Sequence, residues 1–216
     1  MTEEGDEDDA DGGGEVDLGR VLALSDGVFA IAMTLLVLDI RIPDDVHGGD
    51  FLRALAGLEP AVAGYLISYL VIGVLWLAHH RLFRQLRVRH SRIMSLNVLL
   101  LGLVALLPFP SSLLAKHGDE ALSYALYAAN VCAVFAVQTL IIAVSQRNGD
   151  IRPMPGRFPR FGWYLQPMAA VTVFVVWAVV AVTGHPELAN YAWWLLLPLV
   201  IGIRRLNQSK KVLAQS

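Results

Sequence analysis

Six long apolar segments restrict this chain to a helical fold within a membrane. They run approximately over residues 19–40, 58–80, 94–114, 120–144, 163–184 and 188–206. A helix rises about 1.5 Å per residue, so about twenty apolar residues cross the hydrocarbon core of about 30 Å. Lipid offers exposed backbone groups no hydrogen-bond partner, and a helix satisfies these groups internally. We therefore predict an all-α integral membrane protein with six transmembrane helices per chain.

Polar or helix-bending residues interrupt two of the six segments. Asn130 and Gln138 lie in the fourth segment, and Pro198 lies in the sixth. A membrane helix accepts a proline where its neighbours satisfy the freed carbonyl group. We keep both segments as helices, because the chain is 56% hydrophobic and only 17% charged.

The basic residues predict which side of the membrane each loop occupies. Lysine and arginine concentrate in short cytoplasmic loops. Fourteen of the seventeen basic residues fall on one side if the chain crosses six times, and the three on the other side are Arg41, Arg53 and Lys116. We therefore expect both termini to be cytoplasmic and the protein to be a multi-pass component of the cell membrane.

The ends of the chain differ in composition from the apolar part. Nine of the nineteen acidic residues lie in the first seventeen positions, within a glycine-rich run that has little to bury. We expect residues 1–18 to form a disordered acidic tail, residues 19–207 one membrane domain, and residues 208–216 a cytoplasmic tail.

Ser25 and Asp26 place polar groups within the first apolar segment. A charge at the bilayer centre costs roughly 2.5 to 3.5 kcal/mol on insertion scales, so Asp26 needs a partner. One interpretation is that the pair only caps the helix. A helix from Asp26 to Ile40 would measure about 22 Å, however, which is too short to cross. Extending the helix back to Arg20 supplies the length and places both residues inside it.

The partners of this pair are expected on other helices. Arg20 and Asp26 are six residues apart, which is not a same-face spacing. Candidates at a similar depth are Trp76, His79, His80 and Asn97. We predict that they form a polar network with Arg20, Ser25 and Asp26 that supports the first helix. Which histidine takes part stays open, because both could instead be interfacial residues ahead of the arginines.

No motif in the chain indicates an enzyme. His79 and His80 are adjacent, and adjacent helical side chains diverge by about 100°, so we predict no metal site there. HExxH, CxxC, P-loop, GxSxG and GxGxxG motifs are all absent. We expect no catalytic residues, no cofactor and no nucleic-acid partner.

A stripe of apolar residues continues along the first helix beyond Asp26. Ile31, Leu35 and Leu38 recur at helical spacing, and Thr34 lies beside them. Such stripes on membrane helices usually face lipid or neighbouring helices. Spacing alone therefore does not assign the stripe to a pore.

Several of these residues resemble a known family. The run RVLALSD at residues 20–26 resembles the RxxxFSD signature of the transmembrane protein 175 family of lysosomal and prokaryotic potassium channels, with Leu24 in place of its phenylalanine. The following GVFAIAMTLLVLDIRIP is similar to the family's first helix. The resemblance extends to Trp76 and the two histidines, to Asn97, and to the PFP run at residues 108–110 that closes the third helix.

This resemblance implies a function for the stripe. It implies a homotetrameric potassium channel whose central pore is lined by the first helix of each chain. Ile31 would form the narrowest apolar layer or gate, with Leu35 and Leu38 forming further layers toward the outside. Thr34 would match the threonine tied to ion selectivity. The expected partners are copies of the same chain, membrane lipids and permeant potassium ions.

Two alternatives to a channel stay open at this point. Asp26 and the histidines could form a titrating relay in a proton-coupled secondary transporter. Against that reading, the chain shows no duplicated half-helices broken by glycine or proline. The protein could also be a non-conducting membrane partner, which a stable monomer in detergent would favour.

Overall fold

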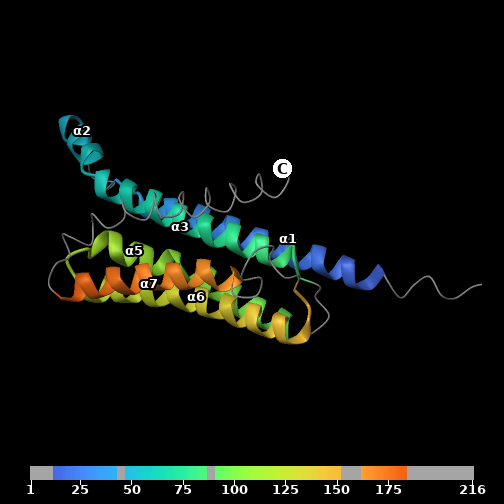
Figure 1. Ribbon diagram of the computed structural model, residues 1–216. Coiled ribbons are helices and arrows are strands. Elements are labelled where there is room, and N and C mark those ends of the chain that lie inside the picture. The colour runs from blue at the N-terminus through green and yellow to red at the C-terminus, as the bar shows by residue number, and fades with distance from the viewer. Residues whose placement is uncertain (1–11, 43–46, 87–90, 152–161, 184–216) are drawn as a thin grey trace, which may run out of the picture.

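The regular elements of this protein are helices throughout the part of the chain that the structure describes (Figure 1). This computed structural model describes residues 12–42, 47–86, 91–151 and 162–183. The elements there are α1 Gly12–Leu35, the 3-10 helix η1 Leu36–Asp39, α2 Gly49–Ala56, α3 Glu59–Phe83, α4 Ser91–Leu106, α5 Pro108–Lys116, α6 Ala121–Asn148 and α7 Gly162–Val182. The predicted all-α fold is confirmed.

Five stretches of the described helices are long and apolar enough to cross a membrane. They are Leu18–Asp39, Gly49–Phe83, Arg92–Lys116, Ala121–Asn148 and Gly162–Val182. Each overlaps one of the first five predicted segments, so the chain is a multi-pass membrane protein. The sixth segment, residues 188–206 with Pro198, lies outside the described residues.

The first helix begins earlier than the composition of the tail suggested. We expected disorder over residues 1–18, whereas α1 already begins at Gly12. The helix ends as the 3-10 turn η1, which brings the combined helical stretch to Asp39. Residues 12–18 therefore extend the helix, and residues 1–11 lie outside the described part.

The third predicted segment consists of two helices. Leu107 interrupts the run between α4 and α5, and Pro108 then occupies the first turn of α5. A proline in a first turn loses no hydrogen bond, because the amide groups there have no partner within the helix. The prolines at 108 and 110 directly follow the end of α4, as expected, but they also begin a second helix, which was not expected.

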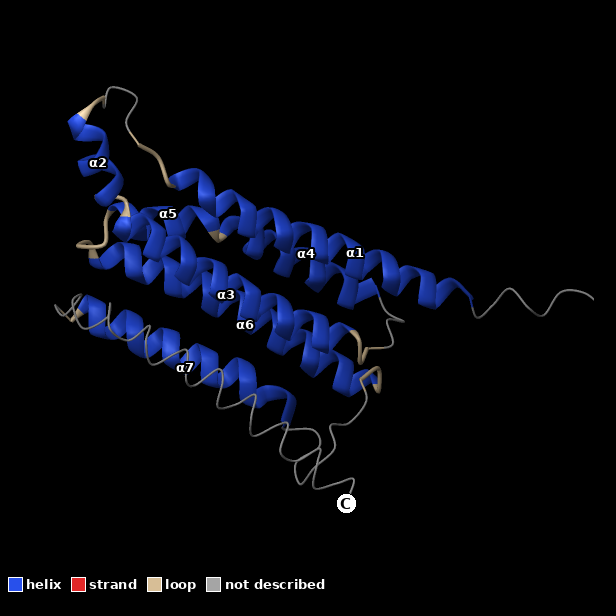
Figure 2. Ribbon diagram, turned by 90° about the horizontal axis from the view of Figure 1, so that it is seen from above, coloured by secondary structure: helices blue, strands red, loops and turns tan. Residues whose placement is uncertain are grey.

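The helices run side by side in a bundle, and α2 turns away from it at one end (Figure 2). α1 packs against α3 and α4, while α6 packs against α4, α5 and, most extensively, α7. At the α6–α7 contact, the ring centroid of Trp177 lies 5.1 Å from that of Tyr124 and 5.8 Å from that of Tyr127. Aromatic pairs at such distances add to the packing energy.

A row of buried polar residues runs along α6. Its members are Ser123, Asn130, Gln138 and Ser145, each at most 8% exposed. Their spacing of seven or eight residues keeps them on one side of the helix. Asn130 and Gln138 therefore interrupt the apolar pattern because they face the protein interior and not the lipid.

Two connecting segments meet beyond the ends of α3 and α6. Leu86 and Ile151 form an isolated antiparallel bridge, and both are buried. Gly149 ends α6 in the left-handed conformation with a φ of 75°. This conformation lets the chain turn back toward Leu86, because glycine adopts it without a steric penalty.

We predict that the α6–α7 contact stabilises the fold through Trp177. Replacing Trp177, which is 2% exposed, by alanine should lower the free energy of unfolding by about 3–5 kcal/mol, because it leaves a large cavity. Its neighbour Val176 is 56% exposed, so Val176→Ala should cost less than about 1 kcal/mol. Unfolding in mixed detergent micelles, followed by circular dichroism, measures both. Equal losses for the two variants would contradict the prediction.

Candidate functional site

The first helix has two faces of opposite character. Its buried face contacts α3 and α4 and consists of Val21, Ser25, Phe29, Ala32 and Leu36, each at most 6% exposed. Steps of three and four residues keep these side chains on one side of the helix. The opposite side is exposed along the whole apolar run. Among the described residues, α1 therefore lies at the edge of the subunit, and one complete face of it is not covered.

Asp26 is bound by a residue of α3. The Trp76 indole Nε1 donates a hydrogen bond of 2.7 Å to Asp26 Oδ1. The Asp26 side chain is 45% exposed, so one edge of the carboxylate contacts the protein and the other is accessible. A donor bound to a carboxylate forms a short and comparatively strong hydrogen bond. This contact ties the N-terminal half of α1 to α3.

Asn97 of α4 connects α1 to α3 through a second set of hydrogen bonds. Its Nδ2 donates to Ser25 Oγ at 3.2 Å, and Ser25 Oγ donates to the Val21 carbonyl at 2.8 Å. Asn97 Oδ1 lies 2.8 Å from His79 Nε2. An amide oxygen only accepts, so the hydrogen bonds assign the His79 proton to Nε2. Three helices therefore meet at one buried amide.

The two histidines take part in different ways. His79 is 1% exposed and stacks on Phe83 with ring centroids 4.2 Å apart, and its Nδ1 has no hydrogen-bond partner among the described residues. That arrangement fits a neutral ring. His80 lies against Trp76 with ring centroids 5.5 Å apart, and its Nδ1 is 3.9 Å from Asp26 Oδ1. This separation is too long for a direct hydrogen bond and forms an ion pair only when His80 is protonated.

The structure does not bring Arg20 to these residues. It brings together Ser25, Asp26, Trp76, His79 and Asn97, with His80 beside them. Arg20 is exposed. Six helical steps place Arg20 about 240° from Asp26, so it shares the exposed face of α1 with Leu24 and Ile31 instead.

The predicted stripe lies on the exposed face of α1. Ile31 is 59% exposed, Leu35 41% and Leu38 54%, although all three are large apolar residues. Thr34 is exposed beside them, and its Oγ1 donates to the Ile31 carbonyl at 2.9 Å. That hydrogen bond uses the hydroxyl proton and leaves oxygen lone pairs as acceptors on the exposed face. This stripe is therefore apolar, with the Thr34 hydroxyl oxygen as an acceptor beside it.

A second set of polar contacts, at the other end of α1, was missed from the sequence. Asp39 Oδ1 accepts a hydrogen bond of 2.7 Å from Ser112 Oγ and lies 3.1 Å from Lys116 Nζ, both on α5. Arg41 Nε donates to the Leu38 carbonyl at 2.7 Å. An acidic residue in the last turn of a helix opposes the helix dipole, and that signal could have indicated a partner for Asp39.

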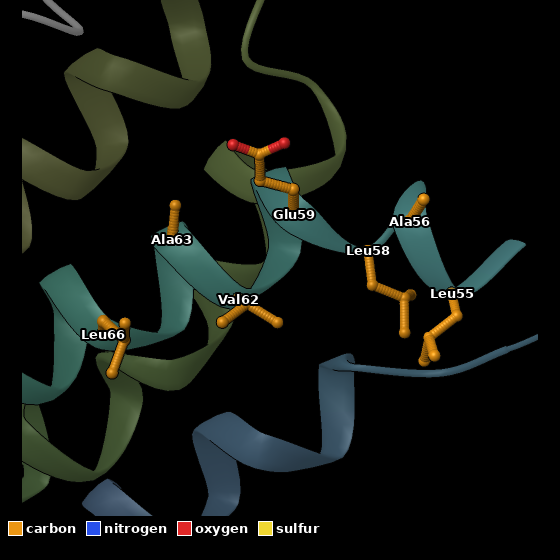
Figure 3. Close-up of a pocket in the computed structure, with 7 residues that line it drawn as sticks. All are labelled: Leu55, Ala56, Leu58, Glu59, Val62, Ala63 and Leu66. Carbon is orange, nitrogen blue, oxygen red and sulfur yellow. The ribbon is translucent and has the colours of Figure 1, made fainter. Parts of the chain in front are cut away.

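An apolar groove lies where α2 meets α3. It has a volume of about 500 Å³ and is lined by Leu55, Ala56, Leu58, Glu59, Val62, Ala63 and Leu66. The Glu59 carboxylate points away from Val62 and Leu58 (Figure 3). Apolar surface of this kind suits lipid more than a polar substrate. Within the described ranges, no three histidine, cysteine or acidic residues lie close enough to hold a metal ion.

Comparison with known proteins confirms the resemblance expected from the sequence. Residues 20–108 match the family model described as the endosomal/lysosomal potassium channel TMEM175. The crystal structure of a lysosomal potassium-selective channel TMEM175 homologue from Chamaesiphon minutus matches with a TM-score of 0.72 and 28% identity, covering 88% of this chain and 98% of that one. The family consists of ion channels and not of enzymes, as expected.

Curated relatives match over part of the chain. A potassium channel of Streptomyces collinus is 45% identical over 102 residues, which cover 47% of this chain and 50% of the relative. The endosomal/lysosomal proton channel TMEM175 of Mus musculus is 42% identical over 97 residues, which cover 41% of this chain and 19% of the relative. The chain thus spans at most about half the length of these two relatives. The range matched by the family model, residues 20–108, contains the positions of Asp26, Trp76, Asn97 and Ile31.

We predict that Asn97 stabilises the junction of α1, α3 and α4. Asn97→Leu should lower the free energy of unfolding by about 1–3 kcal/mol, because it leaves the buried His79 N–H without an acceptor. The double variant Asn97→Leu/His79→Phe should recover part of this loss, since it removes both polar partners. Unfolding in detergent, followed by circular dichroism, measures the differences.

The neighbouring residue provides the control for this prediction. Val98 is 63% exposed, and Val98→Ala should leave the free energy of unfolding nearly unchanged. A loss for Asn97→Leu no larger than that of the control would contradict the prediction. So would a double variant less stable than Asn97→Leu alone.

Proposed function

Because the first half of this chain is related to the TMEM175 potassium channels, we propose that it forms a potassium-selective channel in the cell membrane. The observation that carries the proposal is the exposed face of α1, which holds large apolar side chains on a helix whose other face is fixed by polar contacts. A pore lining requires a helix whose rotation is fixed, because a turned helix would present other side chains to the ion.

The proposed gate is a ring of Ile31 side chains. One Ile31 from each subunit would surround the pore axis, because this residue is among the most exposed on α1. Water wets a narrow apolar ring poorly, so such a ring can block ions without closing completely. Leu35 and Leu38 would add two further apolar layers. Ion passage then requires the ring to widen.

The proposed selectivity depends on partial dehydration near Thr34. Potassium holds its hydration shell less tightly than sodium, so a narrow collar that removes part of the shell favours potassium. Thr34 Oγ1 has already donated its proton to the Ile31 carbonyl, which leaves the oxygen free to accept a cation. Because only one polar layer takes part, selectivity by this route is moderate. The permeant ion is the only ligand that the proposal requires.

The proposed assembly is a homotetramer of six-helix subunits with both termini in the cytoplasm. The resemblance implies the subunit number, and the placement of basic residues supports the orientation. One complete side of α1 has no cover within the described subunit, which supports association through this face. Four-fold symmetry in a low-resolution projection of the purified particle would support it, and a monomer would count against it.

Proton coupling is the second candidate, and one observation favours it. The mouse relative is named a proton channel, and the network here holds Asp26, His79 and His80 within short distances. A channel is favoured because the exposed stripe of α1 offers a continuous path. Saturable uptake driven by a pH gradient, and lost in Asp26→Asn, would favour a transporter instead.

We predict that Ile31→Asn increases potassium flux in the absence of a stimulus. A polar ring is wetted more readily, so the flux should rise by roughly tenfold, equivalent to about 1.4 kcal/mol off the barrier. Potassium flux into vesicles that contain the purified protein measures this change. Ile31→Leu keeps the ring apolar and should conduct like the unaltered protein.

A variant on the lipid-facing side of the subunit controls for the polar substitution itself. Val176 on α7 is 56% exposed, and Val176→Asn should leave the flux unchanged. If Ile31→Asn conducts no more than this control, Ile31 is not the constriction. If the unaltered protein carries no potassium at all, the channel proposal fails.

We predict that Thr34→Val lowers the preference for potassium over sodium by about threefold, because valine keeps the shape and removes the oxygen. Reversal potentials with potassium on one side and sodium on the other measure the ratio. Thr172 on α7 is the matched control, since it is also exposed and donates a 2.9 Å hydrogen bond to the Met168 carbonyl. Thr172→Val should leave the ratio unchanged, and an equal shift in both variants would contradict the role of Thr34.

A further inference from the structure

The outer end of α1 changes its helical type before the chain leaves the bundle. The helix is α as far as Leu35 and 3-10 from Leu36 to Asp39. A 3-10 helix turns about 120° per residue, compared with about 100° for an α-helix. Three residues of 3-10 helix therefore complete one turn and place Leu38 directly above Leu35. In an uninterrupted α-helix, Leu38 would point about 60° away.

Two contacts on consecutive residues hold this turn. Asp39 Oδ1 accepts from Ser112 Oγ and pairs with Lys116 Nζ, and both partners belong to α5. The Leu38 carbonyl accepts from Arg41 Nε, which satisfies an acceptor that the helix end leaves free. We call Asp39, Ser112 and Lys116 the outer clamp. It joins the end of the first helix to the helix that begins at Pro108.

The clamp requires the 3-10 geometry. A 3-10 helix has poorer hydrogen bonds than an α-helix, so it persists where other contacts favour it. Continuing as an α-helix over these four residues would turn Asp39 by about 80° and shorten the segment by about 2 Å. Either movement takes the carboxylate out of reach of Ser112 Oγ, now 2.7 Å away.

The clamp contributes little to stability by its charge alone. The Lys116 side chain is 59% exposed and that of Asp39 is 31% exposed, and exposed ion pairs contribute little to the free energy of unfolding. The clamp instead affects the direction in which the Leu38 side chain points. The two bonds to one carboxylate oxygen fix the position of the residue that directly follows Leu38.

We propose that Asp39 is a positioning residue of the outer pore, an inference that rests on the proposed function. Through the outer clamp it keeps Leu38 pointing along the same face as Leu35. It thereby sets the width of the outermost apolar layer. Loss of the clamp lets the turn relax toward an α-helix, which turns Leu38 by about 60° away from the line of Leu35 and changes the width of that layer.

The test combines single-channel currents with chemical labelling of position 38. In Asp39→Leu, which keeps the volume and removes the acceptor, potassium conductance should change by about twofold, because Leu38 then points in another direction. In a Cys132→Ala/Leu38→Cys background, the same change should alter the rate of labelling by a charged thiol reagent from outside by at least about fivefold, because the thiolate reacts only where water reaches it. Mass spectrometry measures labelling without any current.

The chain provides a matched control and a second way to break the clamp. Asp50 on α2 is exposed and pairs with Arg53 at 3.1 Å, so Asp50→Leu makes the same change on the same side of the membrane. It should alter neither conductance nor labelling. Ser112→Ala/Lys116→Met removes both donors while Asp39 stays, and it should reproduce the effect of Asp39→Leu. Lys116→Arg should preserve the original behaviour.

The possible failures can be told apart. An unchanged labelling rate in both Asp39→Leu and Ser112→Ala/Lys116→Met overturns the inference, whatever the currents show. If Asp39→Leu alters conductance and labelling no more than Asp50→Leu does, the inference is overturned as well. An unaltered protein that carries no potassium overturns the proposed function, and a changed labelling rate in that case would still place Leu38 under the control of Asp39.

Discussion

The rotation of α1 about its own axis is the constraint on which the rest of this structure depends. Successive helical residues are about 100° apart, so a rotation by that angle would already move buried side chains toward the exposed side. Apolar contacts oppose such a rotation only weakly, because lipid and protein interior are similarly apolar. Hydrogen bonds from Trp76 to Asp26 and from Asn97 to Ser25 oppose it strongly. Turning the helix would leave these groups without partners in apolar surroundings.

Much of the architecture could be predicted from segment length and polarity. Five predicted segments coincide with described helices because roughly twenty apolar residues have few alternatives in lipid. The position of Asp26 in such a segment also indicated a partner, since an isolated carboxylate there is costly. Asn130 and Gln138 made the prediction of the fourth segment as a membrane helix less clear. They are buried within the bundle, and hydropathy does not record the direction of a side chain.

Other features depend on which helices lie next to one another. The sequence of a single chain does not reveal that directly. Arg20 was grouped with Asp26 by depth, although the helical angle between them places it on the exposed face. The histidines are adjacent, yet one contacts Asn97 and the other lies beside Trp76. Two further features depend on α5, the helix that begins at Pro108. They are the break between α4 and α5 and the contacts of Asp39. Prolines near the end of an apolar run predict an interruption there, but not its form.

The two faces of α1 also have separate roles, one in holding the subunit together and one in what the subunit exposes. Side chains on the buried face build the subunit, while those on the exposed face add little to its own core. A subunit could therefore acquire its fold before any second copy is present, and the exposed face would gain its burial only on association. Substitutions on that face would then have little effect on the folding of one chain. In evolution, the residues of such a face can change without requiring compensation for a weaker core.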